Sequence, residues 1–165
     1  MGKIKHVAEN KPETKFVQKG SGAINSGIAQ WFGSGSEVGE IHSDFDLIRA
    51  GQSGIPKASI DELATHLGIS RKSMAEDILS VSVKTLERKA KTAKMDKKSS
   101  SHALEIAKIM QHAYEVFEDE QKVKLWVNHS NKALDGKKPV QLLDTLTGLN
   151  MVNDILTRIE EGVYS

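Results

Sequence analysis

The sequence of 165 residues predicts an all-α protein. Beyond residue 57, apolar residues recur at i, i+3, i+4 and i+7 in successive segments, which is the pattern of helices with one buried face. No segment shows the sustained alternation of apolar and polar residues that is typical of strands. Hydrophobic residues make up 38% of the chain and charged residues 27%. We therefore expect a modest core, with part of the chain unpacked.

Residues 1–56 are expected to form a largely flexible N-terminal arm. They contain 9 of the 13 glycines and equal numbers of basic and acidic side chains. Such a segment has little to bury and loses much backbone entropy on folding. Two pieces of the arm, residues 24–32 and 45–50, are expected to dock as short helices.

Residues 57–102 are expected to form three short helices. In the first, Ser59 and Glu62 have the spacing of a capping box, and Gly68 can end the helix in the left-handed conformation. Ser70 and Ser82 are N-cap candidates for the second and third helices. The third helix is expected to run from residue 83 to about residue 94. The expected buried residues are Ile60, Leu63, Ala64, Leu67, Met74, Ile78, Leu79, Leu86, Ala90 and Ala93.

Residues 103–165 are expected to be helical throughout. The loop 131–138 contains an Asp-Gly turn, and Pro139 suits the first turn of the helix after it. That helix is expected to stop at Gly148, with Asn150 capping a final helix that ends at Gly162. The expected buried residues are Ala103, Ile106, Ala107, Met110, Ala113, Tyr114, Phe117, Val123, Trp126, Val127, Leu142, Leu143, Leu146, Val152, Leu156 and Ile159.

The charge distribution favours nucleic acid as a partner of the middle segment. Residues 57–102 have a net charge of +4 and residues 103–165 of −3, although the whole chain has only +1. A helix-turn-helix over residues 71–94 would place the outward side of its second helix in the major groove of DNA. The candidate DNA-binding residues are Ser82, Lys84, Thr85, Arg88, Lys89 and Lys91. The alternative is a solvated, lysine-rich helix of a protein-binding bundle.

Catalysis and metal binding find little support in the sequence. The chain has no cysteine, which excludes disulfides, thiolate catalysis and cysteine-ligated metals. No histidine pair has the i, i+4 spacing of a helical metal site, and the run Gly33-x-Gly35-x-x-x-Gly39 lacks the spacing of a dinucleotide loop. No apolar run is long enough for a membrane span, and no signal peptide is recognisable. We expect a non-enzymatic, cytoplasmic protein without catalytic residues, metal or cofactor.

The end of the chain suggests a contact with a partner. Immediately after Gly162, the predicted final helix presents a β-branched residue, an aromatic ring and a carboxylate in Val163, Tyr164 and Ser165. Such a tail could enter a partner's pocket, where its ring stacks and its carboxylate meets a phosphate-binding arginine. The alternative is a frayed terminus without a role.

Several of these segments together resemble the Xre/MbcA/ParS antitoxins. Residues 134–145, followed by Gly148, Val152, Leu156, Ile159 and the ending Gly162-Val163-Tyr164, are similar to the toxin-binding domain of that family. Residues 113–119, Trp126, Val127 and Asn131 fit the same domain, and residues 83–89 are similar to the end of its Xre-like helix-turn-helix. The resemblance covers residues 57–165. Two departures are a turn at residues 79–82 without glycine and Asp135 where glycine is frequent.

The resemblance implies a bacterial type II antitoxin that consists of an Xre-like helix-turn-helix (57–102) and a small helical toxin-binding domain (103–165). Its expected partners are a RES-domain toxin that consumes NAD, operator double-stranded DNA, and a second copy in a homodimer. The implied toxin-binding residues are Leu134, Gly136, Lys138, Pro139, Arg158, Gly162, Val163, Tyr164 and Ser165. The alternative function is a phage-repressor-type dimeric transcription factor without a toxin partner.

Overall fold

The computed structural model describes residues 27–33 and 36–163. Its helices are η1 (Ile28–Phe32), α2 (Asp44–Ser53), α3 (Lys57–Leu67), η2 (Ser73–Ile78), α4 (Val83–Arg88), α5 (Lys97–Phe117), α6 (Glu120–Val127), η3 (Lys132–Leu134), η4 (Pro139–Leu142) and α7 (Leu146–Glu160). Within these described ranges there is no strand, and one isolated bridge joins Pro56 to Lys94. The all-α prediction is confirmed.

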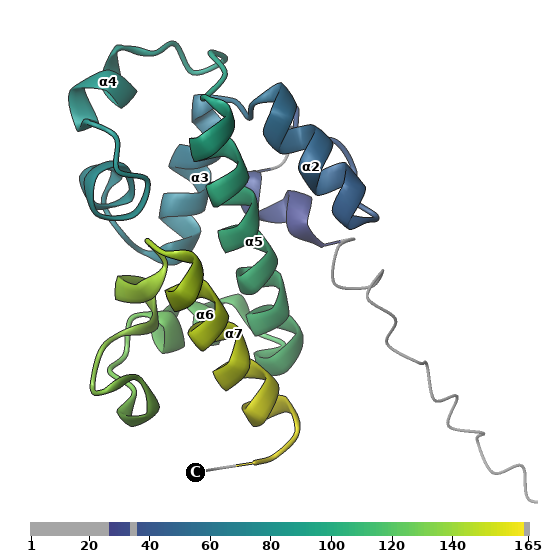
Figure 1. Ribbon diagram of the computed structural model, residues 1–165, viewed down its shortest axis with the longest axis vertical. Coiled ribbons are helices and arrows are strands. Elements are labelled where there is room, and N and C mark those ends of the chain that lie inside the picture. The colour runs from purple at the N-terminus through teal and green to yellow at the C-terminus, as the bar shows by residue number, and fades with distance from the viewer. Residues whose placement is uncertain (1–26, 34–35, 164–165) are drawn as a thin grey trace, which may run out of the picture.

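The long helix α5 is the centre of the fold. Asp96 caps its N-terminus by accepting a hydrogen bond from the Ser99 N–H at 3.0 Å. This bond is the main cause that lowers the pKa of the Asp96 carboxyl. The elements α2, η1, α6 and α7 all pack on α5 (Figure 1). A single hydrophobic core therefore extends from the N-terminal half of the chain to the C-terminal half. The domain boundary predicted at residues 102/103 lies inside α5.

The described part of the N-terminal arm belongs to this core. In η1, Ile28, Trp31 and Phe32 are buried, and the Trp31 indole N–H donates to Gln111 Oε1 at 3.1 Å. Helix α2 packs along α5. The two pieces expected to dock as short helices, residues 24–32 and 45–50, contain η1 and most of α2 in their described parts. Residues 1–26, 34 and 35 of the arm lie outside the described residues.

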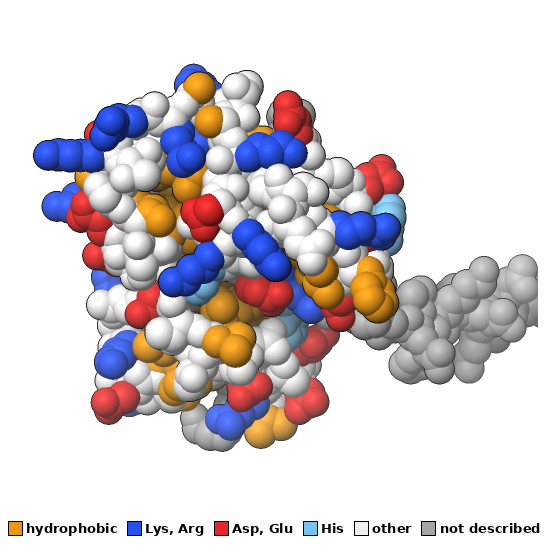
Figure 2. All heavy atoms as spheres, turned by 45° about the horizontal axis from the view of Figure 1, so that its top comes forward, with side chains coloured by type: hydrophobic (Ala, Val, Ile, Leu, Met, Phe, Trp, Pro, Cys, Tyr) orange, Lys and Arg blue, Asp and Glu red, His pale blue; other side chains and the backbone are white. Residues whose placement is uncertain are grey.

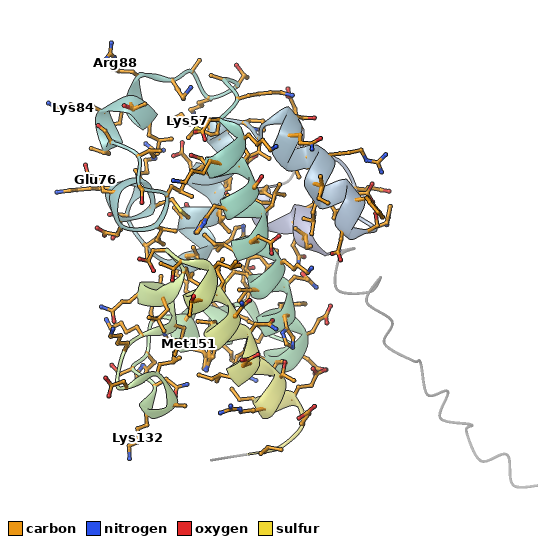
Figure 3. The ribbon with its side chains drawn as sticks, viewed as in Figure 1. Lys57, Glu76, Lys84, Arg88, Lys132 and Met151 are labelled. Carbon is orange, nitrogen blue, oxygen red and sulfur yellow. The ribbon has the colours of Figure 1, made fainter. Side chains whose placement is uncertain are left out.

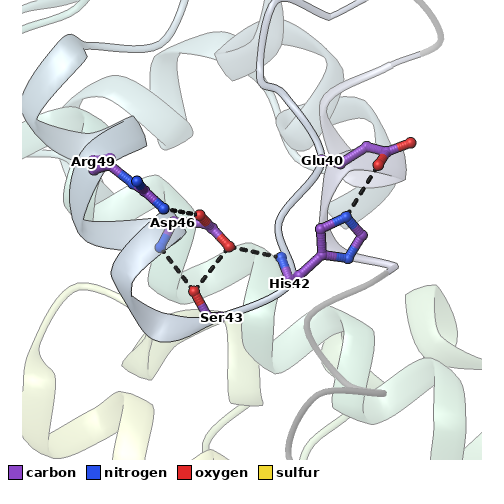
Figure 4. Close-up of polar contacts among 5 residues, drawn as sticks. All are labelled: Glu40, His42, Ser43, Asp46 and Arg49. Atoms are coloured by element: carbon purple, nitrogen blue, oxygen red, sulfur yellow. Dashed lines mark hydrogen bonds and ion pairs between the residues drawn. The ribbon is translucent and has the colours of Figure 1, made fainter.

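The N-terminus of α2 is held by a local network (Figure 4). The Asp46 carboxylate accepts hydrogen bonds from the Ser43 hydroxyl at 2.8 Å and the His42 N–H at 3.1 Å, and it pairs with Arg49. These hydrogen bonds lower the pKa of Asp46 to about 2. The bond from Ser43 has the largest effect, followed by those from His42 and Arg49. This network fixes the start of α2 and the preceding bend.

The N-terminus of α3 does not have the predicted Ser59 cap. Ser59 lies buried inside the helix rather than at its cap, and the N-cap is Pro56, which makes no side-chain capping bond. The first free N–H groups, of Lys57 and Ala58, instead donate to the backbone carbonyls of Ala93 and Lys91 at 2.9 and 3.0 Å. Residues 89–95, which are distant in the sequence, therefore cap α3. Their carbonyls can accept these bonds because this segment is not helical and does not use them in a helix of its own.

The third predicted helix, α4, ends at Arg88 instead of about residue 94, because the carbonyls of the residues that follow accept hydrogen bonds from the start of α3. The Met95 N–H donates to Ile55 O at 2.8 Å, which continues the pairing of this segment with the chain before α3. Ala90 is exposed and Ala93 half-buried, so neither packs as predicted. The predicted ending of α3 at Gly68 is confirmed, with a left-handed φ of 70°.

The last helix also begins earlier than predicted. The Thr145 hydroxyl caps α7 by accepting from the Gly148 N–H at 3.1 Å, so a helix stop at Gly148 and a cap at Asn150 are both wrong. Pro139 begins only the short η4, and Leu146 is 70% exposed rather than buried. A Cβ at position 148 would lie 1.9 Å from Leu142 O. Glycine is needed there because it lets α7 lie directly on η4.

Candidate functional site

Helix α4 packs against the rest of the protein through one face. Leu86 is 1% exposed and packs into the core, whereas Lys84, Thr85 and Arg88 are exposed. Figure 3 shows Lys84 and Arg88 directed away from the body of the molecule. The six residues of α4 are too few to form a stable helix alone. The position of this exposed face therefore depends on the elements beneath it.

The element beneath α4 is η2, a π-helical turn. Met74 and Ile78 of η2 are buried as predicted, and the Ser70 hydroxyl accepts a hydrogen bond from the Ser73 N–H at 3.0 Å, as its predicted capping role requires. The turn that follows contains no glycine. Ser80 instead adopts the left-handed backbone, with φ 55°. The Val81 N–H then donates to Ala75 O at 2.8 Å, which closes the turn.

Cations surround α4. Among the described residues, Lys84 and Arg88 make no ion pair, and Lys91 is also exposed, whereas Lys89 is half-buried. Figure 2 shows Lys and Arg side chains gathered at the upper left, over this end of the molecule. Ser82 occupies the N-cap position without a capping bond from its side chain. The structure thus brings the six predicted DNA-binding residues together on α4 and its margins.

Three charged residues that the sequence reasoning missed connect α3 to the start of η2. Lys57 Nζ lies 2.9 Å from Asp61 Oδ2, and both side chains are largely buried. Arg71 Nε lies 3.1 Å from Asp61 Oδ1, although this oxygen accepts no aligned hydrogen bond. A buried ion pair of this kind is costly to break on one side only, because the remaining charge is left unpaired. The spacing of Lys57 and Asp61 at i, i+4 was the available signal.

A second candidate surface lies in the C-terminal part of the chain. Asn131 closes its loop by accepting the Gly136 N–H at 3.0 Å and donating its own N–H to Lys137 O at 3.0 Å. The turn places Asp135 and Gly136 in left-handed conformations, with φ 56° and 74°. Leu134 and Pro139 are buried beneath this loop, so they shape the surface rather than form it. Gly136 and Lys138 are exposed.

The end of α7 turns the chain outward. Gly162 has φ 71°, and the Val163 N–H donates back to Arg158 O at 2.8 Å, which is a left-handed helix ending. Arg158 and Gly162 are exposed, and Val163 is 52% exposed. Tyr164 and Ser165 lie outside the described residues.

A hollow of about 100 Å³ lies beside this end, between η3 and α7. Two predicted contact residues, Leu134 and Arg158, line it together with residues that the sequence reasoning missed, among them Met151 (Figure 3). Met151 is 43% exposed. Its signal in the sequence was weak, because a single apolar residue on the outer side of a helix is common in any protein.

The arrangement of η2, the glycine-free turn and the cationic α4 is that of a helix-turn-helix protein. Residues 46–108 match the model of the antitoxin Xre-like helix-turn-helix domain, and residues 112–162 match that of the antitoxin Xre/MbcA/ParS C-terminal toxin-binding domain. These two matches support membership of the chain in the Xre/MbcA/ParS antitoxin family, as the resemblance indicated. The first match starts eleven residues before the predicted domain boundary, so it includes most of α2.

A search of curated proteins finds no match. Neither matching family is described as an enzyme. In the part of the chain that the structure describes, no group of three potential ligand side chains is placed to hold a metal ion. No helix in that same part is both long and apolar enough to cross a bilayer.

Proposed function

We propose that this chain is the antitoxin of a type II toxin–antitoxin system in the bacterial cytoplasm. It binds and sterically neutralises a RES-domain toxin that consumes NAD, and it represses its own operon as a homodimer. The observation that carries the proposal is the separation of two different exposed surfaces, which lie toward opposite ends of α5 (Figure 1). The cationic α4 lies at the N-terminal end of α5, and the end of α7 lies at the opposite end of the molecule (Figure 1). One protein can therefore hold DNA and toxin at the same time.

At the DNA surface, α4 enters the major groove with Thr85 and Arg88 toward base edges. Arg88 has the fork of donors that matches the O6 and N7 acceptors of guanine. Lys84, Lys89 and Lys91 lie beside the phosphates, and the uncapped hydroxyl of Ser82 is free to donate to one. Exposed cations without an ion pair support this role, because no acidic partner has to be displaced when a phosphate binds.

At the toxin surface, Val163, Tyr164 and Ser165 enter the NAD pocket of the toxin. Gly162 gives the direction of the tail, and the exposed Arg158, Lys138 and Gly136 contact the rim of the pocket. Leu134 and Pro139 act from below, by supporting the loop that carries the contacts. Neutralisation is steric: the tail and NAD compete for one cavity.

A truncated chain that lacks residues 163–165 tests the toxin role. It is expected to keep DNA binding but to lose protection of cells that express the toxin encoded beside it, because the residues that fill the pocket are gone. The measurements are growth on toxin induction, and NAD consumption by the purified toxin with each antitoxin variant. Equal protection by the truncated and the full-length chain would contradict insertion of the tail.

The phage-repressor alternative predicts a different result for the full-length chain. Such a repressor would bind its operator as a dimer but would neither co-purify with the product of the adjacent gene nor protect against it. Affinity purification of the tagged full-length protein, followed by identification of the bound chain, separates the two functions. A protein-binding bundle without DNA contacts would instead show no salt-dependent binding to the operator, since it releases no counterions from DNA.

A further inference from the structure

A hollow between the two family-matched segments is used by neither proposed surface. It has a volume of about 160 Å³ and is lined by Gln30, Trp31, His66, Tyr114 and Glu120. These residues come from four separate elements, η1, α3, α5 and α6. His66 belongs to the segment that matches the helix-turn-helix model, and Tyr114 and Glu120 to the segment that matches the toxin-binding model.

Three of the lining residues are aromatic and meet at steep angles. The nearly buried Trp31 ring forms the floor. The centroid of the His66 ring lies 5.3 Å from that of Trp31, the centroid of the Tyr114 ring lies 6.5 Å from it, and both planes are inclined by 72° to the indole. The negative face of an aromatic ring attracts a cation within about 6 Å, and methylated ammonium groups are bound in such aromatic cages.

The polar groups of the hollow also favour a cation. Glu120 Oε1 lies 2.5 Å from His66 Nδ1, and the carboxylate is about half exposed, so it can also meet a ligand. No Lys or Arg is among the five lining residues. The Gln30 amide and the Trp31 indole both donate to Gln111 Oε1, at 2.8 and 3.1 Å, which holds one wall and the floor in place. Glu120 is the one acidic side chain among the five lining residues.

We propose that this aromatic cage binds a small organic cation of the methylated ammonium class. The cation lies between the Tyr114 and His66 rings above Trp31, with the Glu120 carboxylate as its counter-ion. The site joins η1 and α3 to α5 and α6, so its occupant contacts both halves of the chain. This inference does not depend on the DNA or toxin roles.

Fluorescence titration of the full-length chain tests the cage. The chain has two tryptophans, and Trp126→Phe leaves Trp31 as the only indole. In this background, tetramethylammonium chloride is expected to cause a saturable change in emission, whereas sodium chloride and neopentyl alcohol, a neutral compound of similar shape, are not. Tyr114→Ala is expected to weaken binding at least about fivefold, and the matched Tyr114→Phe, which keeps the ring, by less than about twofold. Glu120→Gln is expected to weaken binding as well.

Three results would overturn the proposal. The first is the absence of a saturable response to tetramethylammonium. The second is an equal response to neopentyl alcohol, which would identify an apolar hollow without selectivity for charge. The third is unchanged affinity in Tyr114→Ala. Far-UV circular dichroism of each variant confirms that the comparison is made between folded proteins.

Discussion

The helix that carries the DNA-binding candidates and the helix that leads to the toxin-binding tail are built in opposite ways. Helix α4 has six residues, one buried side chain and no side-chain cap. Helix α7 has 15 residues, a threonine cap and an inner face with Leu149, Val152, Ile155 and Leu156 buried. The first helix is positioned by its neighbours, whereas the second has most of its stabilising interactions within itself and with α5. Substitutions in α4 should therefore change mainly the position of α4 itself, whereas substitutions in α7 should change the stability of the whole fold.

The largest effect is expected from Leu86→Ala. This substitution removes the one buried side chain of α4, and deletions of this kind cost about 2–5 kcal/mol. Because only the partly buried Val83 would then still pack α4 against the core, operator binding should be lost while toxin binding persists. Urea unfolding and two binding assays measure this. The matched control is Leu125→Ala on α6, where the leucine is 68% exposed, with an expected change below about 0.5 kcal/mol. Loss of toxin binding in Leu86→Ala would contradict the view that changes in α4 remain local to the DNA surface.

The next effect is expected at the start of α7. In Gly148→Ala the new Cβ meets Leu142 O, so α7 must move away from η4. Overpacking of this kind costs about 1–3 kcal/mol, although alanine is the better helix former. The free energy of unfolding from urea denaturation is the measurement. Gly39→Ala is the control, because a Cβ there meets nothing within 4 Å. A stabilised Gly148→Ala variant would show that the close approach of α7 and η4 is not required.

A pair of arginine substitutions then separates the two surfaces. Arg88→Ala is expected to lower operator affinity by about 1–3 kcal/mol if Arg88 contacts a base, without altering toxin binding. Arg158→Ala, at the other end of the molecule, is expected to do the reverse. Fluorescence anisotropy with operator DNA and calorimetry with the purified toxin measure the two affinities at one salt concentration. Unchanged operator affinity in Arg88→Ala would remove this residue from the DNA surface.

The smallest effect concerns the two N-caps. Thr145→Ala removes a capping hydrogen bond to the Gly148 N–H and is expected to cost about 1 kcal/mol of stability. Ser82→Ala is the matched control, because Ser82 occupies the N-cap position of α4 but its side chain makes no capping bond. Its stability should be unchanged, while operator binding should weaken if the hydroxyl contacts a phosphate. Thermal unfolding of both variants gives the comparison, and equal losses of stability would contradict it.

Much of the candidate DNA surface could be predicted from the sequence, because it depends on short-range signals. The buried positions Met74, Ile78 and Leu86 follow helical spacing, and the charges on the opposite side of α4 follow from the same period. The place of Met151 in the hollow beside η3 and the burial of Leu134 depend on which elements pack against α7. Nothing local in the sequence encodes that packing.

By itself, the sequence determined the all-α class, most of the buried helical faces and the glycine endings at Gly68 and Gly162. These features depend on the side chains of a few consecutive residues. Only the tertiary structure decided how the helix N-termini are satisfied, where α4 stops and that η1 belongs to the core. A free N–H donates to whichever acceptor lies nearest in space, and at α3 the acceptors are the backbone carbonyls of residues 91 and 93 rather than the nearby Ser59 hydroxyl.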